Sequence, residues 1–177
     1  MAARRTRSFL ALMAAAAALS AGIPARAASE AELKAAIVFN LLLFVEWPPE
    51  SRPAPGSPWI LCVSPSNASA DVMRQLAGRP LRDSHLQLAP WPDGERSARC
   101  HAAFLGAEDL EPGPKDATPR KGLLTIADVT ARGADAVAVR LRSHGNRLGF
   151  SLNMQALKAA QIQPSLKLVR LAQGAHE

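Results

Sequence analysis

The chain has two cysteines, Cys62 and Cys100, and the second is followed directly by His101. A cysteine beside a histidine could be a nucleophile activated by a general base. Adjacent residues of a strand point to opposite faces, however, so His101 in a strand could not readily deprotonate Cys100. A disulfide would also remove the thiolate that catalysis needs. We therefore expect no catalytic residues here, and in an oxidising compartment we predict one disulfide between Cys62 and Cys100.

Other residue types that could carry chemistry are dispersed along the chain. No H-x-x-x-H, C-x-x-C or glycine-rich phosphate-binding spacing occurs, so the sequence predicts neither a metal site nor a cofactor. Asp128 and Asp135 show no sign of a paired acid–base site. We therefore expect a protein that is not an enzyme. The histidines are interpreted as surface or strand-end residues: His85, His101, His144 and His176.

Residues 1–27 have the composition of a secretory signal peptide. Arginines lie near the start, an alanine-rich apolar run covers residues 9–23, and Ala25-Arg26-Ala27 fits the small-x-small cleavage pattern. The alternative is an uncleaved membrane anchor, but the apolar run is shorter than the roughly 20 residues that span a bilayer. We expect cleavage near Ala27, which leaves residues 28–177 as a single exported domain.

The net charge depends on that cleavage. The whole chain carries +6 from 21 basic and 15 acidic residues, and four of the arginines lie within residues 1–27. The remaining 17 basic residues against 15 acidic ones give the exported domain a charge of +2. Because no basic tract with interleaved aromatic residues occurs, we expect no nucleic-acid partner.

The stretch from Ser29 to Pro49 predicts an amino-terminal helix that is apolar on almost every side. Ser29 and Glu32 fit a capping box that starts the helix, and Pro48 disfavours helical geometry at Trp47, which should end it. Such a helix is buried on most sides or shared with a partner. We expect one side to pack on a sheet and the other to be a dimer or partner surface. The first side holds Ile37, Leu41 and Phe44, and the second holds Val38, Phe39 and Leu42.

Further along, short apolar runs alternate with helical patterns. The runs predict strands at residues 59–63, 85–89, 100–106, 122–126, 136–141 and 148–152, and the helical patterns lie at residues 68–77, 153–160 and 164–172. The last two runs flank His144-Gly145-Asn146, a turn signal. Alternation of strands and helices favours a parallel sheet covered on both faces. The predicted fold is α/β: a mixed, mainly parallel sheet flanked by helices on both faces, with a carboxyl-terminal β-hairpin and two closing helices.

The closing helices carry two local signals. Asn153 is a good N-cap candidate for the first of them. In the second, Leu168, Leu171 and Ala172 form the predicted buried stripe, while Lys167 and Arg170 lie on the other side.

Four blocks of sequence span almost the whole exported chain and carry a family resemblance. In this order and after a signal peptide, they resemble the YfiR/HmsC-like family of periplasmic regulators. The blocks are Leu33-Lys34-Ala35 to Phe39-Asn40 with Phe44 and Glu46-Trp47-Pro48; Leu61-Cys62-Val63; Cys100-His101 to Leu105; and Arg147 to Asn153 followed by Ser165-Leu166-Lys167-Leu168 and Leu171-Ala172.

The resemblance implies a periplasmic protein, usually a dimer, that acts by binding other proteins. The typical partner is the periplasmic portion of an inner-membrane diguanylate cyclase, and another membrane sensor is the alternative. The regulator holds the cyclase inactive, and its release raises cyclic di-GMP and favours biofilm formation. Cys62 and Cys100 match the family's cysteine pair. Some relatives have a second cysteine pair, which this chain lacks, so redox sensing built on that pair is absent.

The candidate partner-binding or dimer residues are Val38, Phe39, Leu42, Trp47 and Arg147. Trp47 could form an aromatic patch with the tryptophan at position 59, although packing of the proline-rich segment by its own aromatics is the simpler interpretation. A second function also stays open. An α/β domain has crevices at its strand ends, so the chain could be a periplasmic small-molecule-binding module that serves a transporter or sensor.

Overall fold

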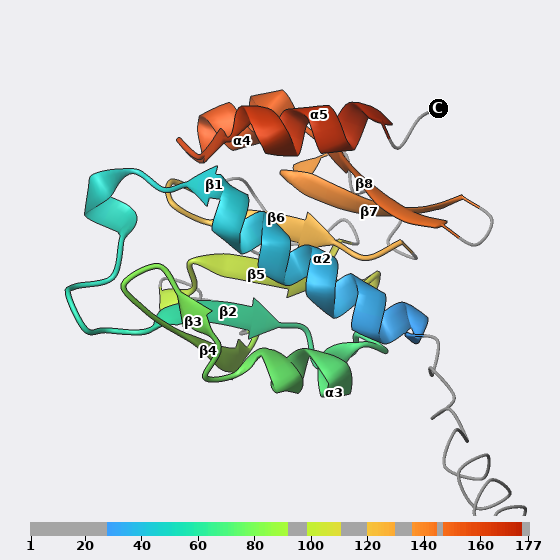
Figure 1. The fold of residues 1–177 in the computed structure, drawn as a ribbon, viewed down its shortest axis with the longest axis horizontal. Coiled ribbons are helices and arrows are strands. Elements are labelled where there is room, and N and C mark those ends of the chain that lie inside the picture. The colour runs from blue at the N-terminus through green and yellow to red at the C-terminus, as the bar shows by residue number, and fades with distance from the viewer. Residues whose placement is uncertain (1–27, 92–98, 111–119, 130–135, 145–146, 175–177) are drawn as a thin grey trace, which may run out of the picture.

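The computed structural model describes residues 28–91, 99–110, 120–129, 136–144 and 147–174, and shows a sheet with one long helix lying across it (Figure 1). The predicted signal peptide and the predicted turn at Gly145-Asn146 lie outside the described residues. Among the described helices, none has the length and apolar character needed to cross a membrane.

The first described helix, α2 (Glu30–Phe44), begins as the sequence predicts. Ser29 Oγ accepts a hydrogen bond from the Glu32 N–H at 3.2 Å, and the Glu32 carboxylate accepts one from the Ser29 N–H at 2.6 Å. The helix ends earlier than predicted. The chain leaves it as a two-residue strand, β1 (Val45–Glu46), which pairs antiparallel with β9 (Gln163–Pro164). This pairing provides partners for backbone groups that a longer helix would have bonded internally.

The main sheet is mixed and mainly parallel, as predicted. Its strands lie in the order β3-β4-β2-β5-β6-β7-β8, in which β4 through β7 are parallel neighbours and β3 and β8 are antiparallel edges. The predicted strands exist, with ends displaced by a few residues, as is usual for boundaries. The short edge strand β3 (Pro80–Leu81) was not predicted. The bounds of the others are β2 (Trp59–Val63), β4 (Ser84–Pro90), β5 (Ala102–Leu105), β6 (Leu124–Ala127), β7 (Val139–His144) and β8 (Arg147–Leu152).

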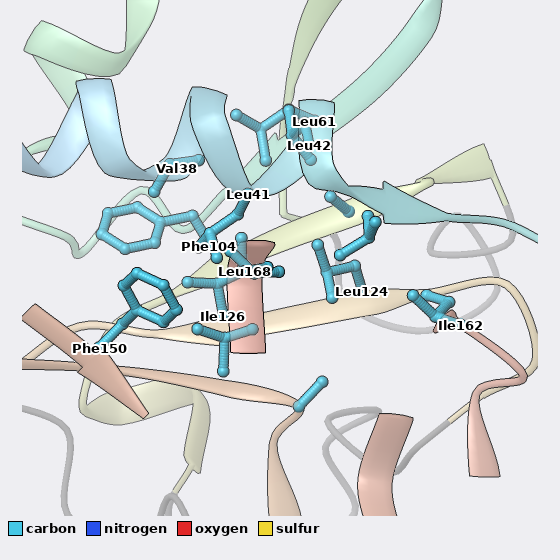
Figure 2. Close-up of a cluster of buried hydrophobic side chains, with 14 of the residues drawn as sticks. Val38, Leu41, Leu42, Leu61, Phe104, Leu124, Ile126, Phe150, Ile162 and Leu168 are labelled. Carbon is cyan, nitrogen blue, oxygen red and sulfur yellow. The ribbon is translucent and has the colours of Figure 1, made fainter. Parts of the chain in front are cut away.

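The described α-helices all cover the same face of this sheet. α2 lies between α3 and α5, and every helix contributes side chains to one core. Figure 2 shows Val38 and Leu41 of α2 gathered with Phe104, Ile126 and Phe150 of the strands. The remaining helical elements on this face are α3 (Ala70–Met73), the 3₁₀ turn η3 (Arg74–Leu76), α4 (Met154–Ala159) and α5 (Leu166–Gly174).

On the opposite face, the prediction of helices on both faces is not confirmed by the described residues. In the described part of the chain, a second and smaller cluster forms there from Trp91, Leu123, strand residues and the two cysteines, and no α-helix contributes to it. The short 3₁₀ turn η5 (Glu108–Leu110) packs against it through Leu110. A strand that is buried on both faces has a continuous apolar sequence, whether helices or loops cover it. The sequence pattern therefore could not show which of the two covers this face.

The predicted disulfide between Cys62 and Cys100 is present in this second cluster. It links β2 to the residues that lead into the adjacent strand β5, and the two Cα atoms lie 5.8 Å apart. Both cysteines are buried. The disulfide therefore supports a face of the sheet that the described helices do not cover.

The two closing helices bear out one prediction and correct another. Asn153 caps α4, since its Oδ1 accepts hydrogen bonds from the Gln155 and Ala156 N–H groups, each at 3.0 Å. In α5, Leu168 is buried as expected, but Leu171 is 51% exposed. Leu171 therefore faces solvent beside the core instead of lying within it.

Candidate interaction groove between α2 and α5

Two of the residues predicted for the partner side of α2 are buried within the chain itself. Val38 and Leu42 are almost completely buried, together with Leu41, in the core under the helix. The reason is that α2 meets the sheet below and has α3 and α5 on its two sides, so a wide arc of the helix is covered. Val38 and Leu42 therefore offer no surface to a partner in this conformation.

Phe39 and Arg147, two further candidates, keep some exposure. Phe39 is half-buried against the core, and the guanidinium carbon of Arg79 lies 4.4 Å from its ring centroid. A cation over an aromatic face is a favourable contact within the chain itself. Arg147 is exposed at the start of the edge strand β8. Their roles in partner binding stay predictions.

Trp47 is also a core residue rather than a surface aromatic. It is 2% exposed, and its Nε1 donates a hydrogen bond to the His101 carbonyl oxygen at 3.1 Å. Its ring centroid lies 4.7 Å from that of Trp59, which is buried as well. The proline-rich segment is thus flanked by tryptophans that pack on each other, which was the simpler interpretation of the sequence.

A groove of about 610 Å³ opens between α2, β8 and α5. We call it the α2–α5 groove. Its inner surface is apolar, and Figure 2 shows Leu41, Phe150 and Leu168 lying together in this part of the core. Its lining comes from three elements: Ile37, Asn40, Leu41 and Phe44 of α2; Leu148, Gly149 and Phe150 of β8; and Lys167, Leu168, Arg170 and Leu171 of α5.

The charges of the α2–α5 groove all have one sign. Lys167 and Arg170 are exposed, and none of the described residues that line the groove is acidic. The Lys167 ammonium lies 4.7 Å from the centroid of the Phe44 ring, which holds a positive charge over the apolar wall. An apolar segment that carries an acidic group would match both the surface and the charge.

The exposed leucines of α5 differ in what they face. Leu171 lines the α2–α5 groove while keeping 51% of its surface exposed, and Leu166 is 78% exposed but is not part of the lining. Large apolar residues at the margin of a cavity are typical of interaction sites. Sequence reasoning missed the groove because it placed Leu171 on the buried stripe. The sequence shows only that Leu171 lies near cationic residues of the same helix, and this does not reveal which side of the helix is covered by the rest of the protein.

The structure brings Cys100 and His101 into no nucleophile–base pair. Cys100 is in the disulfide, and His101 Nδ1 accepts a hydrogen bond from the Ile60 N–H at 2.9 Å. Asp128, considered above as an acid–base candidate, is buried in an ion pair with Lys34. Among the described residues, no group of three or more histidines, cysteines or acids could hold a metal ion.

Comparisons with known proteins point to one family. A family model described as YfiR/HmsC-like matches residues 31–173, which is nearly all of the described chain. A search of curated proteins found no match.

Proposed function

This chain belongs to the YfiR/HmsC-like family, and from that premise we propose that it is a periplasmic regulator that binds an inner-membrane diguanylate cyclase and holds it inactive. The family match is the observation that carries this proposal. A buried disulfide fits an oxidising compartment such as the periplasm. The absence of a nucleophile–base pair at Cys100 and His101 agrees with a role in binding rather than in catalysis.

The α2–α5 groove is the contact that we propose for the cyclase. Its apolar floor and its two cations suit an apolar segment with an acidic residue from the periplasmic portion of the membrane protein. A regulator acts on such an enzyme through its difference in affinity for the active and inactive states. If the groove binds the segment only as the inactive enzyme presents it, binding shifts the cyclase toward that state and lowers cyclic di-GMP.

Replacing Leu171 with aspartate should weaken cyclase binding by about tenfold or more, which corresponds to a loss of about 1.4 kcal/mol. The change puts a carboxylate at the margin of the groove, where it removes apolar surface and repels the acidic group of the partner. The matched control is Leu166→Asp, which makes the same substitution on the same helix outside the groove. Tagged variants would be used to recover the partner from detergent-solubilised inner membranes, with mass spectrometry to identify a protein that has a diguanylate cyclase domain.

The two variants separate the possible outcomes. Retention of the cyclase by wild type and Leu166→Asp, with loss by Leu171→Asp and unchanged thermal unfolding, supports the groove as the contact. Equal retention by all three proteins would overturn it. The homodimer expected from the resemblance gives a different pattern: light scattering would show a monomer for Leu171→Asp alone while the cyclase is still recovered.

A further inference from the structure

A second hollow, of about 480 Å³, lies at the amino-terminal ends of the central parallel strands. It is bounded by the segment that follows α2, by the starts of β2 and β5, and by the turn before β6, and the disulfide residue Cys100 forms part of its wall. We call it the basic pocket. Its charged and hydrogen-bonding lining residues are Glu50, Arg52, Arg99, His101, Arg120 and Lys121.

The charges around the basic pocket are strongly unbalanced. Among the described lining residues, four side chains are cationic, and the one acidic side chain, Glu50, is already in an ion pair with Lys121. Arg99 is exposed and makes no hydrogen bond or ion pair within the part of the chain that the structure describes. Arg52 uses its Nε to hold the Trp47 carbonyl oxygen at 3.1 Å, which fixes its guanidinium group at the pocket. The described lining therefore has a surplus of positive charge.

His101 adds a hydrogen-bond donor of defined tautomer. Because its Nδ1 accepts the Ile60 N–H at 2.9 Å, the proton of the neutral ring must be on Nε2. Burial lowers the pKa of His101, which favours the neutral ring. Its ring lies 5.0 Å from that of Trp59, and its Nε2–H has no acceptor in the described part of the chain. The pocket wall thus holds an oriented donor without adding a charge to bury.

The wall of the basic pocket at Gly122 is closely packed against its neighbours. Gly122 has φ +74°, and a Cβ at this position would lie 2.2 Å from Ser51 Oγ on the facing segment. The Gly122 N–H also donates to the Ala160 carbonyl oxygen at 2.8 Å. Only glycine can take this conformation and allow this approach without strain. The disulfide at Cys100 anchors another wall, so the pocket is formed before any ligand arrives.

We propose that the basic pocket binds the phosphate group of a small phosphorylated molecule. Three guanidinium groups and a lysine supply more positive charge than one carboxylate would balance, whereas a phosphate monoester has about −1.5 to −2 charge. Guanidinium groups bind phosphate oxygens through paired N–H donors. The neutral N–H of His101 can add another bond to such an oxygen. The volume exceeds that of a phosphate ion, and Ile60 and two prolines give an apolar wall for the rest of the ligand.

Isothermal titration calorimetry on the purified exported domain tests this, at pH 7 and constant ionic strength set with chloride. The titrants are inorganic phosphate, adenosine monophosphate as a small phosphorylated probe, and adenosine as its uncharged counterpart. We expect saturable binding of the monophosphate and none of adenosine. Binding of inorganic phosphate with similar affinity identifies the free ion as sufficient, and much weaker binding of the free ion shows that the apolar wall contributes.

The decisive variant is Arg99→Gln, which removes an exposed cation that makes no hydrogen bond or ion pair with the described residues. It should weaken binding at least tenfold, as expected for the loss of a charge-assisted hydrogen bond. Arg74→Gln, the same change on η3 outside the pocket, should bind like the wild type. No saturable binding of either phosphate compound would overturn the proposal. So would an equal affinity for adenosine, or an equal loss of affinity in both variants, because these results indicate nucleoside binding or nonspecific charge attraction.

Discussion

Replacing Lys34 with methionine is expected to lower the free energy of unfolding by about 3–5 kcal/mol. Lys34 is buried in α2, and its Nζ lies 2.8 Å from Asp128 Oδ1 and 2.9 Å from Glu30 Oε1. Asp128 is buried too, so loss of the lysine leaves a carboxylate without its counter-charge inside the protein. Removal of one partner costs far more than the pair contributes, because the remaining ion cannot regain its hydration. Urea unfolding followed by circular dichroism measures the change.

Matched variants make this result specific to the buried pair. Lys158→Met replaces an exposed lysine of α4 and should change the free energy of unfolding by no more than about 0.5 kcal/mol. The double variant Lys34→Met, Asp128→Leu should recover most of the stability lost in the single variant, since neither residue then carries a charge. A loss of less than 1 kcal/mol in Lys34→Met would mean that Asp128 is not held by this ion pair (a threshold below the range given for broken buried pairs).

The ion pair between Lys34 and Asp128 also makes the free energy of unfolding depend on pH. Burial alone lowers the pKa of Lys34, but hydrogen bonds to Asp128 and Glu30, with their charges, outweigh burial and raise it above 10.5. A raised lysine pKa contributes stability that is fully present below the pKa of the unfolded chain and is lost as the pH rises through the folded value. The difference in stability between wild type and Lys34→Met should therefore be constant near neutral pH and shrink at strongly alkaline pH.

Removing the disulfide should have an effect of similar size. In the chain-entropy description, a link between residues 38 positions apart stabilises the fold by about 4 kcal/mol. The variant Cys62→Ala, Cys100→Ala should lose about that amount in urea unfolding without reductant. Reductant should destabilise the wild type by a similar amount and leave the variant unchanged. The contradicting result is a loss of less than about 1 kcal/mol in the free energy of unfolding, both on adding reductant and in the double variant. The disulfide would then not restrict the conformations of the unfolded chain as the chain-entropy description requires.

Local features of the fold were predictable because short-range chemistry fixes them. Ser29 and Glu32 form their capping box, Asn153 caps α4, and the apolar run from Trp59 to Val63 is a strand with the predicted bounds. Each of these signals depends on residues within about one turn of each other. The disulfide was predictable for a different reason, since two cysteines allow only one pairing.

Features that depend on how helices and strands pack against each other could not be predicted from such short-range signals. Val38 and Leu42 were placed on a partner surface because α2 is apolar nearly all round, and only the positions of α3 and α5 show which arc is covered. Leu171 was placed in the core by the same helical spacing that correctly buried Leu168. The α2–α5 groove is the space left between three separately predictable elements, so its existence is a property of the assembled fold rather than of any segment.

The most direct test of the central claim is the cellular level of cyclic di-GMP in a strain that lacks this protein but keeps its cyclase. A regulator that holds a diguanylate cyclase inactive predicts that cyclic di-GMP rises on deletion and falls again when the wild-type chain is supplied. The Leu171→Asp chain, exported in equal amounts, should fail to lower it, and the Leu166→Asp chain should succeed. An unchanged level of cyclic di-GMP in the deletion strain would contradict the account.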